Sequence, residues 1–120
     1  MQLQKFNFFK TNRILKRSSF VELSKSGKRI KNKYVIVVYS PGTTDNCRLG
    51  ITVTKKIGNS VQRNRLKRYA REFFRVNKSR FKFNWDINII ARTEAVNITS
   101  EKMFLNLHES FNKIEEGFDN

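Results

Sequence analysis

The stretch from Lys55 to Glu72, KKIGNSVQRNRLKRYARE, constrains the fold more than any other part of the chain, because it has the pattern of an amphipathic helix. Apolar side chains recur in it, and just beyond it, at the spacing of one helix face. They are Leu66, Tyr69, Ala70, Phe73 and Phe74. We therefore predict a helix that begins after the Gly-Asn-Ser segment, with Ser60 as its N-cap, and that packs this face against a core.

The basic side chains of this predicted helix point away from the apolar face, since successive residues turn by about 100°. The cations roughly opposite the apolar face, or on its flanks, are Arg63, Arg65, Lys67, Arg68, Arg71 and Arg75, and the neutral Asn64 lies among them. Glu72 is the one acid between Arg63 and Arg75, so these cations repel one another unless a polyanion neutralises them. A merely solvated helix face is the alternative, although arginine suits phosphate oxygens well.

The net charge of +15 also indicates a polyanionic partner. Two segments carry it: residues 1–33 hold ten Lys and Arg against one acid, and residues 48–82 hold twelve against one. Residues 83–120 hold three against seven acids. We therefore expect the C-terminal part of the chain to lie away from the ligand.

The length of 120 residues and the hydrophobic content of 38% suit one folded domain. We place it at residues 13–120, after a basic tail at residues 1–12. The longest apolar run, Tyr34 to Tyr39, has six residues and is too short to cross a membrane. With Cys47 as the single cysteine and His108 as the single histidine, neither a disulfide nor a zinc cluster can form within the chain. We expect Cys47 to be a small apolar strand residue and the protein to be cytoplasmic.

Sequence patterns predict the remaining elements. Helical spacing runs from about residue 14 to 25 and stops near Gly27. Residues 34–39 and 47–54 have the composition and alternation of strands, and the polar loop between them predicts an antiparallel pair. Residues 85–91 form a third predicted strand, and Thr99 can cap a last helix.

This order of elements predicts an α+β fold, a two-layer sandwich with a small mixed sheet. The segment that joins residues 47–54 to residues 85–91 contains the basic helix and is long enough for the two strands to pair in parallel. General statistics would make that crossover right-handed.

The run KKIGNSVQRNRLKRYARE, with CRLGITVTKK leading into it and INIIAR in the third strand, resembles the bacterial ribonuclease P protein component. The resemblance covers roughly residues 13–115. It implies a left-handed βαβ crossover, against the general rule, and a further short strand.

The resemblance also implies a function. Proteins of this family bind the ribonuclease P catalytic RNA and the 5′ leader of precursor tRNA, and they assist endonucleolytic removal of the leader. The RNA is the catalyst, so no protein residue is expected to be catalytic, and Mg2+ is expected chiefly on the RNA. The sequence agrees, because it offers no nucleophile beside a base and no carboxylate pair of evident spacing. Whether the protein itself holds a metal ion stays open.

By position, the resemblance assigns RNA contacts to the basic helix and the loop before it. These residues are Lys55, Lys56, Asn59, Arg63, Asn64, Arg65, Lys67, Arg68 and Arg71. Contacts of this kind set position and affinity without reading sequence.

The resemblance further implies a leader-binding cleft between the first helix and the sheet. Phe20 matches a family aromatic on the helix, and strand alternation places Tyr34, Ile36 and Val38 on one face. The chain departs from the family at Ser24 and Val38, where aromatic residues are common, so we hypothesise that Tyr34 supplies the stacking surface. The alternative is that Phe20, Tyr34, Ile36 and Val38 are simply core residues.

Other functions fit less well. A structural RNA-binding protein, such as a ribosomal component, would share the charge and the basic helix. A protein-only nuclease would need metal-binding carboxylates, but residues 1–82 contain only Glu22, Asp45 and Glu72, which are far apart in sequence. Sheet-face and single-strand recognition suits RNA better than DNA, and we expect no membrane partner.

Overall fold

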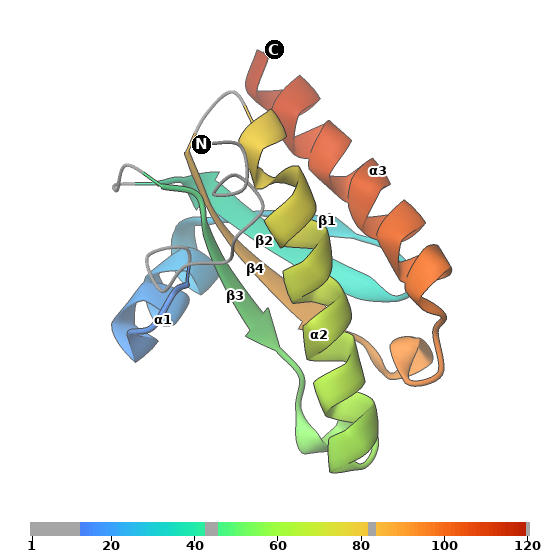
Figure 1. Cartoon of the computed structure of the whole chain (residues 1–120). Helices are drawn as coiled ribbons and strands as arrows, with labels where there is room; N and C mark the ends of the chain where they lie inside the picture. Colours follow the sequence, from blue (N-terminus) through green and yellow to red (C-terminus); the bar gives the residue numbers. More distant parts are fainter. Residues whose placement is uncertain (1–12, 43–45, 82–83, 120) are drawn as a thin grey trace.

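The computed structural model of the chain describes residues 13–42, 46–81 and 84–119. Helices, strands and short 3-10 turns alternate along these ranges (Figure 1). In chain order they are α1 (Arg17–Ser26), β1 (Lys28–Lys31), β2 (Val35–Pro41), β3 (Arg48–Thr52), η3 (Lys55–Ile57), α2 (Ser60–Asn77), η4 (Lys78–Arg80), β4 (Trp85–Ala91), η5 (Thr93–Ala95) and α3 (Ser100–Asp119). The predicted basic tail at residues 1–12 lies outside the described residues.

The four strands form one mixed sheet in the order β1-β2-β4-β3. β4 pairs antiparallel with β2 and parallel with β3. The predicted parallel pairing is confirmed, but the prediction that β2 and β3 are direct neighbours is wrong. The reason is burial. Most side chains of β4 are buried, and a position between two other strands shields such an apolar strand from water better than an edge position does.

Helices lie on both faces of the sheet. Figure 1 shows α2 and α3 side by side on one face, with α1 on the other. Alternate strand residues such as Val35, Val37, Ile87 and Ile89 belong to the large core under α2 and α3. A smaller cluster under α1 contains Ile14, Leu23 and Val38. The α+β class with a small mixed sheet is confirmed, with α1 covering part of the second face.

The ends of the helices follow local chemistry. At the end of α1, the Gly27 amide donates to the Leu23 carbonyl at 2.8 Å, and any Cβ on Gly27 would lie only 2.8 Å from Val38 Cγ1. At the start of α3, the Lys102 amide donates to Thr99 Oγ1 at 3.2 Å, which confirms the predicted cap. No helix within the described ranges is long and apolar enough to span a bilayer.

β1 is the further short strand that the family resemblance implied. It pairs antiparallel with β2, with Lys28 opposite Tyr39 and Lys31 opposite Ile36. Three of its four side chains are basic and exposed, so the sequence pattern alone does not mark it as a strand. The left-handed β3–α2–β4 crossover stays a prediction.

Candidate nucleic-acid interface

The start of α2 is fixed by a reciprocal cap. The Gln62 amide donates to Asn59 Oδ1, and the Asn59 amide donates to Gln62 Oε1, both at 2.9 Å. Asn59 is therefore the N-cap, and the prediction that Ser60 fills this position is wrong. The Asn-x-x-Gln spacing was the sequence signal for this arrangement. The side-chain oxygen of Asn59, a predicted RNA contact, is thus occupied by the helix itself.

The turn before α2 needs Gly58. Its φ of 136° lies in a region that side chains with a Cβ rarely adopt, and a Cβ there would collide with Gln62 Oε1. Gln62 Nε2 also donates to Asn97 Oδ1 at 3.3 Å, which ties the turn to the segment before α3. Lys55 and Lys56 are exposed on this fixed turn, as a phosphate contact requires.

The two faces of α2 separate as predicted. Leu66, Ala70, Phe73 and Phe74 are buried, whereas Asn64, Arg68 and Arg71 are exposed and Arg63, Arg65 and Lys67 are half-buried. A shallow hollow of about 600 Å³ follows the outer face and is lined by Val61, Asn64, Arg65, Arg68 and Arg71. One further cation is partly neutralised, since Arg75 Nη2 lies 2.8 Å from Glu72 Oε2. We call the outer side chains Asn64, Arg65, Arg68 and Arg71 the basic ridge.

A groove joins the inner side of this ridge to α1. Lys67 and Arg71 line it from α2, together with Phe20 of α1, Ile51 of β3 and the segment before α1. Its volume is about 190 Å³. The structure thus brings a predicted leader-cleft residue and two predicted RNA contacts to one depression.

Phe20 holds its place because of a glycine in β3. A Cβ on Gly50 would collide with the Phe20 ring, so the ring lies directly on the backbone of the strand. Gly50 sits opposite Asn88 of β4, whose Oδ1 accepts a hydrogen bond from Thr52 Oγ1 at 3.2 Å. Phe20 is half-buried, which leaves part of the ring accessible beside these polar groups.

The predicted cleft residues of β2 have different fates. Ile36 is half-buried and lies opposite Ile90 on the α1 face of the sheet. Val38 is only 1% exposed and packs beneath Leu23 and Gly27. The expectation that Val38 lines the cleft is therefore wrong, because α1 covers it.

Tyr34 is also misplaced by the prediction. β2 begins at Val35, so strand alternation does not extend to Tyr34. Its ring packs against the core under α2 and α3, and Lys102 Nζ of α3 lies 5.4 Å from the ring centroid. Tyr34 therefore does not share a face with Ile36, and the hypothesis that it supplies the stacking surface of the cleft loses its geometric basis.

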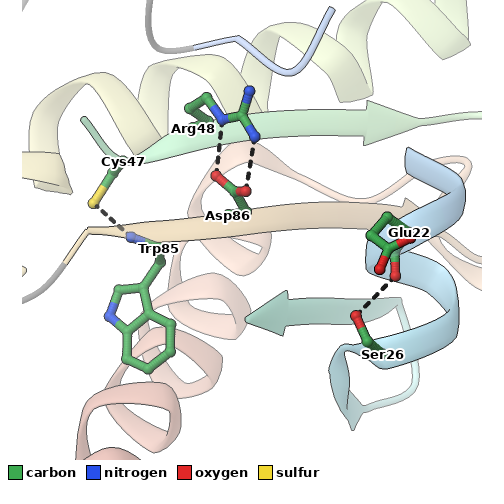
Figure 2. A network of polar contacts seen from close by, with 6 residues as sticks. All are labelled: Glu22, Ser26, Cys47, Arg48, Trp85 and Asp86. Carbon is green, nitrogen blue, oxygen red and sulfur yellow. Dashed lines mark hydrogen bonds and ion pairs between the residues drawn. The ribbon is translucent and has the colours of Figure 1, made fainter. Parts of the chain in front are cut away.

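An ion pair that the sequence pattern did not predict lies on the α1 face of the sheet. Arg48 Nε and Nη2 donate to the two carboxylate oxygens of Asp86 at 2.9 and 2.8 Å (Figure 2). This bond raises the pKa of the Arg48 guanidinium further. The pair floors a depression of about 650 Å³ beside α1, and the serines at its rim are Ser18, Ser19, Ser26 and Ser40. The sequence feature that could have predicted this pair is strand alternation, which places both Arg48 and Asp86 on the side of their strands that faces away from the large core.

Cys47 has a structural position. Its thiol is buried and accepts a hydrogen bond from the Trp85 amide, with 3.4 Å between nitrogen and sulfur (Figure 2). Burial raises the pKa of this thiol. The prediction of a small buried residue is confirmed, but Cys47 lies one residue before β3, which begins at Arg48, and is not itself part of the strand. Among the described residues, no three His, Cys, Asp or Glu side chains gather in a way that could hold a metal ion.

Comparison with known proteins connects this geometry to one family. A family model described as Ribonuclease P matches residues 8–115. The ribonuclease P protein component of Desulfatibacillum aliphaticivorans is 43% identical over 112 residues, which cover 93% of this chain and 95% of that protein. That of Syntrophus aciditrophicus is 51% identical over 90 residues, covering 75% and 76%.

Solved structures give the same result. The RNase P protein of Staphylococcus aureus superposes with a TM-score of 0.76 at 38% identity, covering 86% of this chain and 94% of that one. The Thermotoga maritima protein gives 0.68 at 36% identity, covering 79% and 93%. With a basic ridge on α2 that adjoins a groove against α1, and with this similarity over most of its length, the chain belongs to the ribonuclease P protein family, the protein component of a ribonucleoprotein endoribonuclease.

Proposed function

We propose that this chain binds the ribonuclease P catalytic RNA through α2 and holds the 5′ leader of precursor tRNA in the groove beside α1. In this way it assists cleavage at the mature 5′ end of the tRNA. The observation that supports the proposal most strongly is the groove shared by Phe20, Lys67 and Arg71. One helix can thus contact the catalytic RNA with its outer ridge while Lys67 faces the leader, and Arg71 borders both surfaces.

The RNA contacts we propose are electrostatic. Arg68 and Arg71 are exposed on the ridge, where guanidinium groups can pair with phosphate oxygens in a bidentate manner. Lys55 and Lys56 extend this surface around the start of α2. Contacts of this kind hold RNA of many sequences, which suits a protein that must accept different precursors.

The leader site that we propose differs in two of its four residues from the predicted one. It retains Phe20 and Ile36 and gains Ile90 and Thr52, which lie in the same row across the sheet as Ile36. An apolar floor with hydroxyl and amide groups at its side suits unpaired nucleotides, whose bases can pack against the ring of Phe20. Tyr34 and Val38 are not part of this site.

Catalysis is assigned to the RNA. Phosphodiester hydrolysis needs an activated water and stabilisation of the phosphate charge, and magnesium ions held chiefly by RNA phosphates can supply both. The part we assign to the protein is to place the leader and to neutralise phosphate repulsion between the two RNAs.

The test is cleavage of a precursor tRNA by a bacterial ribonuclease P RNA at low magnesium, with and without the chain. We expect the protein to restore cleavage at the mature 5′ end. A matched pair of variants tests the leader site. Phe20→Ala should weaken binding of precursor tRNA but not of mature tRNA. Val21→Ala, on the exposed side of α1, should leave the affinity for both RNAs unchanged. If several bacterial RNAs showed no gain with folded protein, the proposed function would be wrong.

A further inference from the structure

A second basic surface lies at the sheet edge farthest from β3. β1 forms that edge, and residues 28–33, Lys-Arg-Ile-Lys-Asn-Lys, contain four cations and no acid. All four basic side chains are exposed. This surface belongs to the N-terminal charged segment, which neither the α2 ridge nor the groove beside α1 accounts for.

The turn between β1 and β2 is rigidly held. Asn32 Oδ1 accepts hydrogen bonds from the amides of Tyr34 and Val35, both at 2.9 Å, and Asn32 Nδ2 donates to Ser110 Oγ of α3 at 3.2 Å. Arg92 Nη1 donates to the Asn32 carbonyl at 2.7 Å. The backbone that carries Lys33 and Tyr34 is therefore fixed before any ligand arrives.

Two lysines from separate elements meet at the Tyr34 ring. Lys33 Nζ lies 5.6 Å and Lys102 Nζ lies 5.4 Å from the ring centroid. A hydrogen bond from Lys102 lowers the pKa of the Tyr34 hydroxyl, and the positive charges of both lysines act in the same direction. The half-buried ring thus has the ammonium groups of two exposed lysines, from separate elements, within about 6 Å of its centroid.

Little negative charge opposes these lysines. Glu94 interacts with Lys33, but it is already engaged by the Thr93 hydroxyl at 2.7 Å and by Arg92 at 3.8 Å. Glu101 precedes Lys102 on α3 and is exposed. With Arg92 balancing Glu94, the corner keeps a positive charge that an anion would stabilise.

Protection of an edge strand explains only part of this arrangement. Lysines on an edge strand discourage pairing with other chains, and those of β1 can do so. Lys102, however, comes from α3 and has no such task, and Lys33 lies in the turn after the strand. Lysine ammonium groups contact phosphate oxygens, and an aromatic ring beside them can pack against an unpaired base, so this turn has the groups that a single strand of RNA needs.

We propose that Lys33, Tyr34 and Lys102 form a second RNA contact at the β1 edge, where the two ammonium groups hold phosphates of a strand different from the one on α2. The protein would then bridge two RNA segments, one at each edge of its sheet. This inference rests on the proposed function only for the identity of the natural RNA, because the contact itself needs no more than a phosphodiester chain.

The experiment measures the salt dependence of RNA affinity for the full chain and for Lys33→Ala and Lys102→Ala. Lys113→Ala is the matched control. Lys113 is exposed on the same helix as Lys102, and its substitution by alanine removes the same positive charge. Two probes are used, a bacterial ribonuclease P RNA and poly(U). We expect each test variant to flatten the slope of log K against log salt by about 0.7 to 0.9 with at least one probe, and the control to leave it unchanged.

Slopes equal to that of Lys113→Ala with both probes would overturn the inference. Increased self-association of the variants with unchanged slopes would also overturn it, because edge protection would then be the whole role of these lysines. The low-magnesium cleavage assay distinguishes failure of the proposed function from failure of the β1-edge contact. Native cleavage with unaffected slopes in the variants rejects only the β1-edge contact, whereas flattened slopes on poly(U) without cleavage reject only the proposed function.

Discussion

At the scale of single residues, Gly50 controls the groove beside α1. The Phe20 ring lies where a Cβ of residue 50 would be, so Gly50→Ala must displace the ring. We expect a loss of about 1–3 kcal/mol in the free energy of unfolding, the usual cost of overpacking, together with weaker binding of the leader. Urea unfolding and precursor binding test both parts. Gly42→Ala, in the loop after β2, is a milder control, and equal behaviour of the two variants would contradict this role of Gly50.

Cys47 makes stability depend on pH in the alkaline range. Its folded pKa is raised above the unfolded value of about 8.5, so above that pH the unfolded chain loses a proton that the folded chain keeps. The free energy of unfolding should therefore fall as pH rises from about 8.5 toward the folded pKa. Cys47→Ala should lose this part of the slope in urea titrations between pH 7 and 10. Equal slopes for the two proteins would show that the thiol is not responsible.

At the scale of elements, α2 packs against the core with one set of side chains, and we propose that it binds RNA with another. Leu66→Ala and Phe73→Ala remove buried groups and should reduce the free energy of unfolding by about 2–5 kcal/mol. At low temperature, where these variants are still folded, their RNA affinity should match that of the native chain. Thermal unfolding and RNA titration measure the two effects. A fall in affinity of the folded variants as large as that in a ridge variant would mean that the two faces are not independent.

The same element shows what could be predicted from sequence. A period of 3.6 residues over many residues determines which side of α2 is buried, so both faces were predicted correctly. The cap was not, because Asn59 and Ser60 are both good caps and only the Gln62 bond decides between them. β1 was not predicted because its side chains are mostly basic and exposed, which is not a strand pattern. It becomes a strand only by pairing with β2 in the assembled sheet.

Strand neighbours and cleft residues depend on the assembled fold. Nothing in residues 34–54 indicates that β4, far along the chain, inserts between β2 and β3. Alternation assigned Tyr34 to the wrong surface because Asn32 bonds the backbone and ends the strand pattern at Val35. Val38 has the correct face, but its burial depends on where α1 lies.

At the scale of the whole molecule, charge and shape divide the surface into separate regions. The basic ridge is on α2, which packs beside β3 at one edge of the sheet, and the lysines around Tyr34 lie near β1 at the other edge. The acid-rich C-terminal part of the chain forms much of α3, whose side chains Met103, Leu107, Phe111 and Ile114 are buried in the core. The expectation that the C-terminal part lies away from the ligand stays a prediction, and the contact proposed at Lys102 would be an exception to it.

The central claim is that the basic ridge binds RNA phosphates. The most direct measurement is the salt dependence of affinity for a bacterial ribonuclease P RNA, for the native chain and for Arg68→Ala and Arg71→Ala. We predict that each substitution flattens the slope by about one unit and leaves the unfolding midpoint unchanged, because both side chains are exposed. Slopes identical to that of the native chain would contradict the claim and would leave the ridge as a solvated helix face.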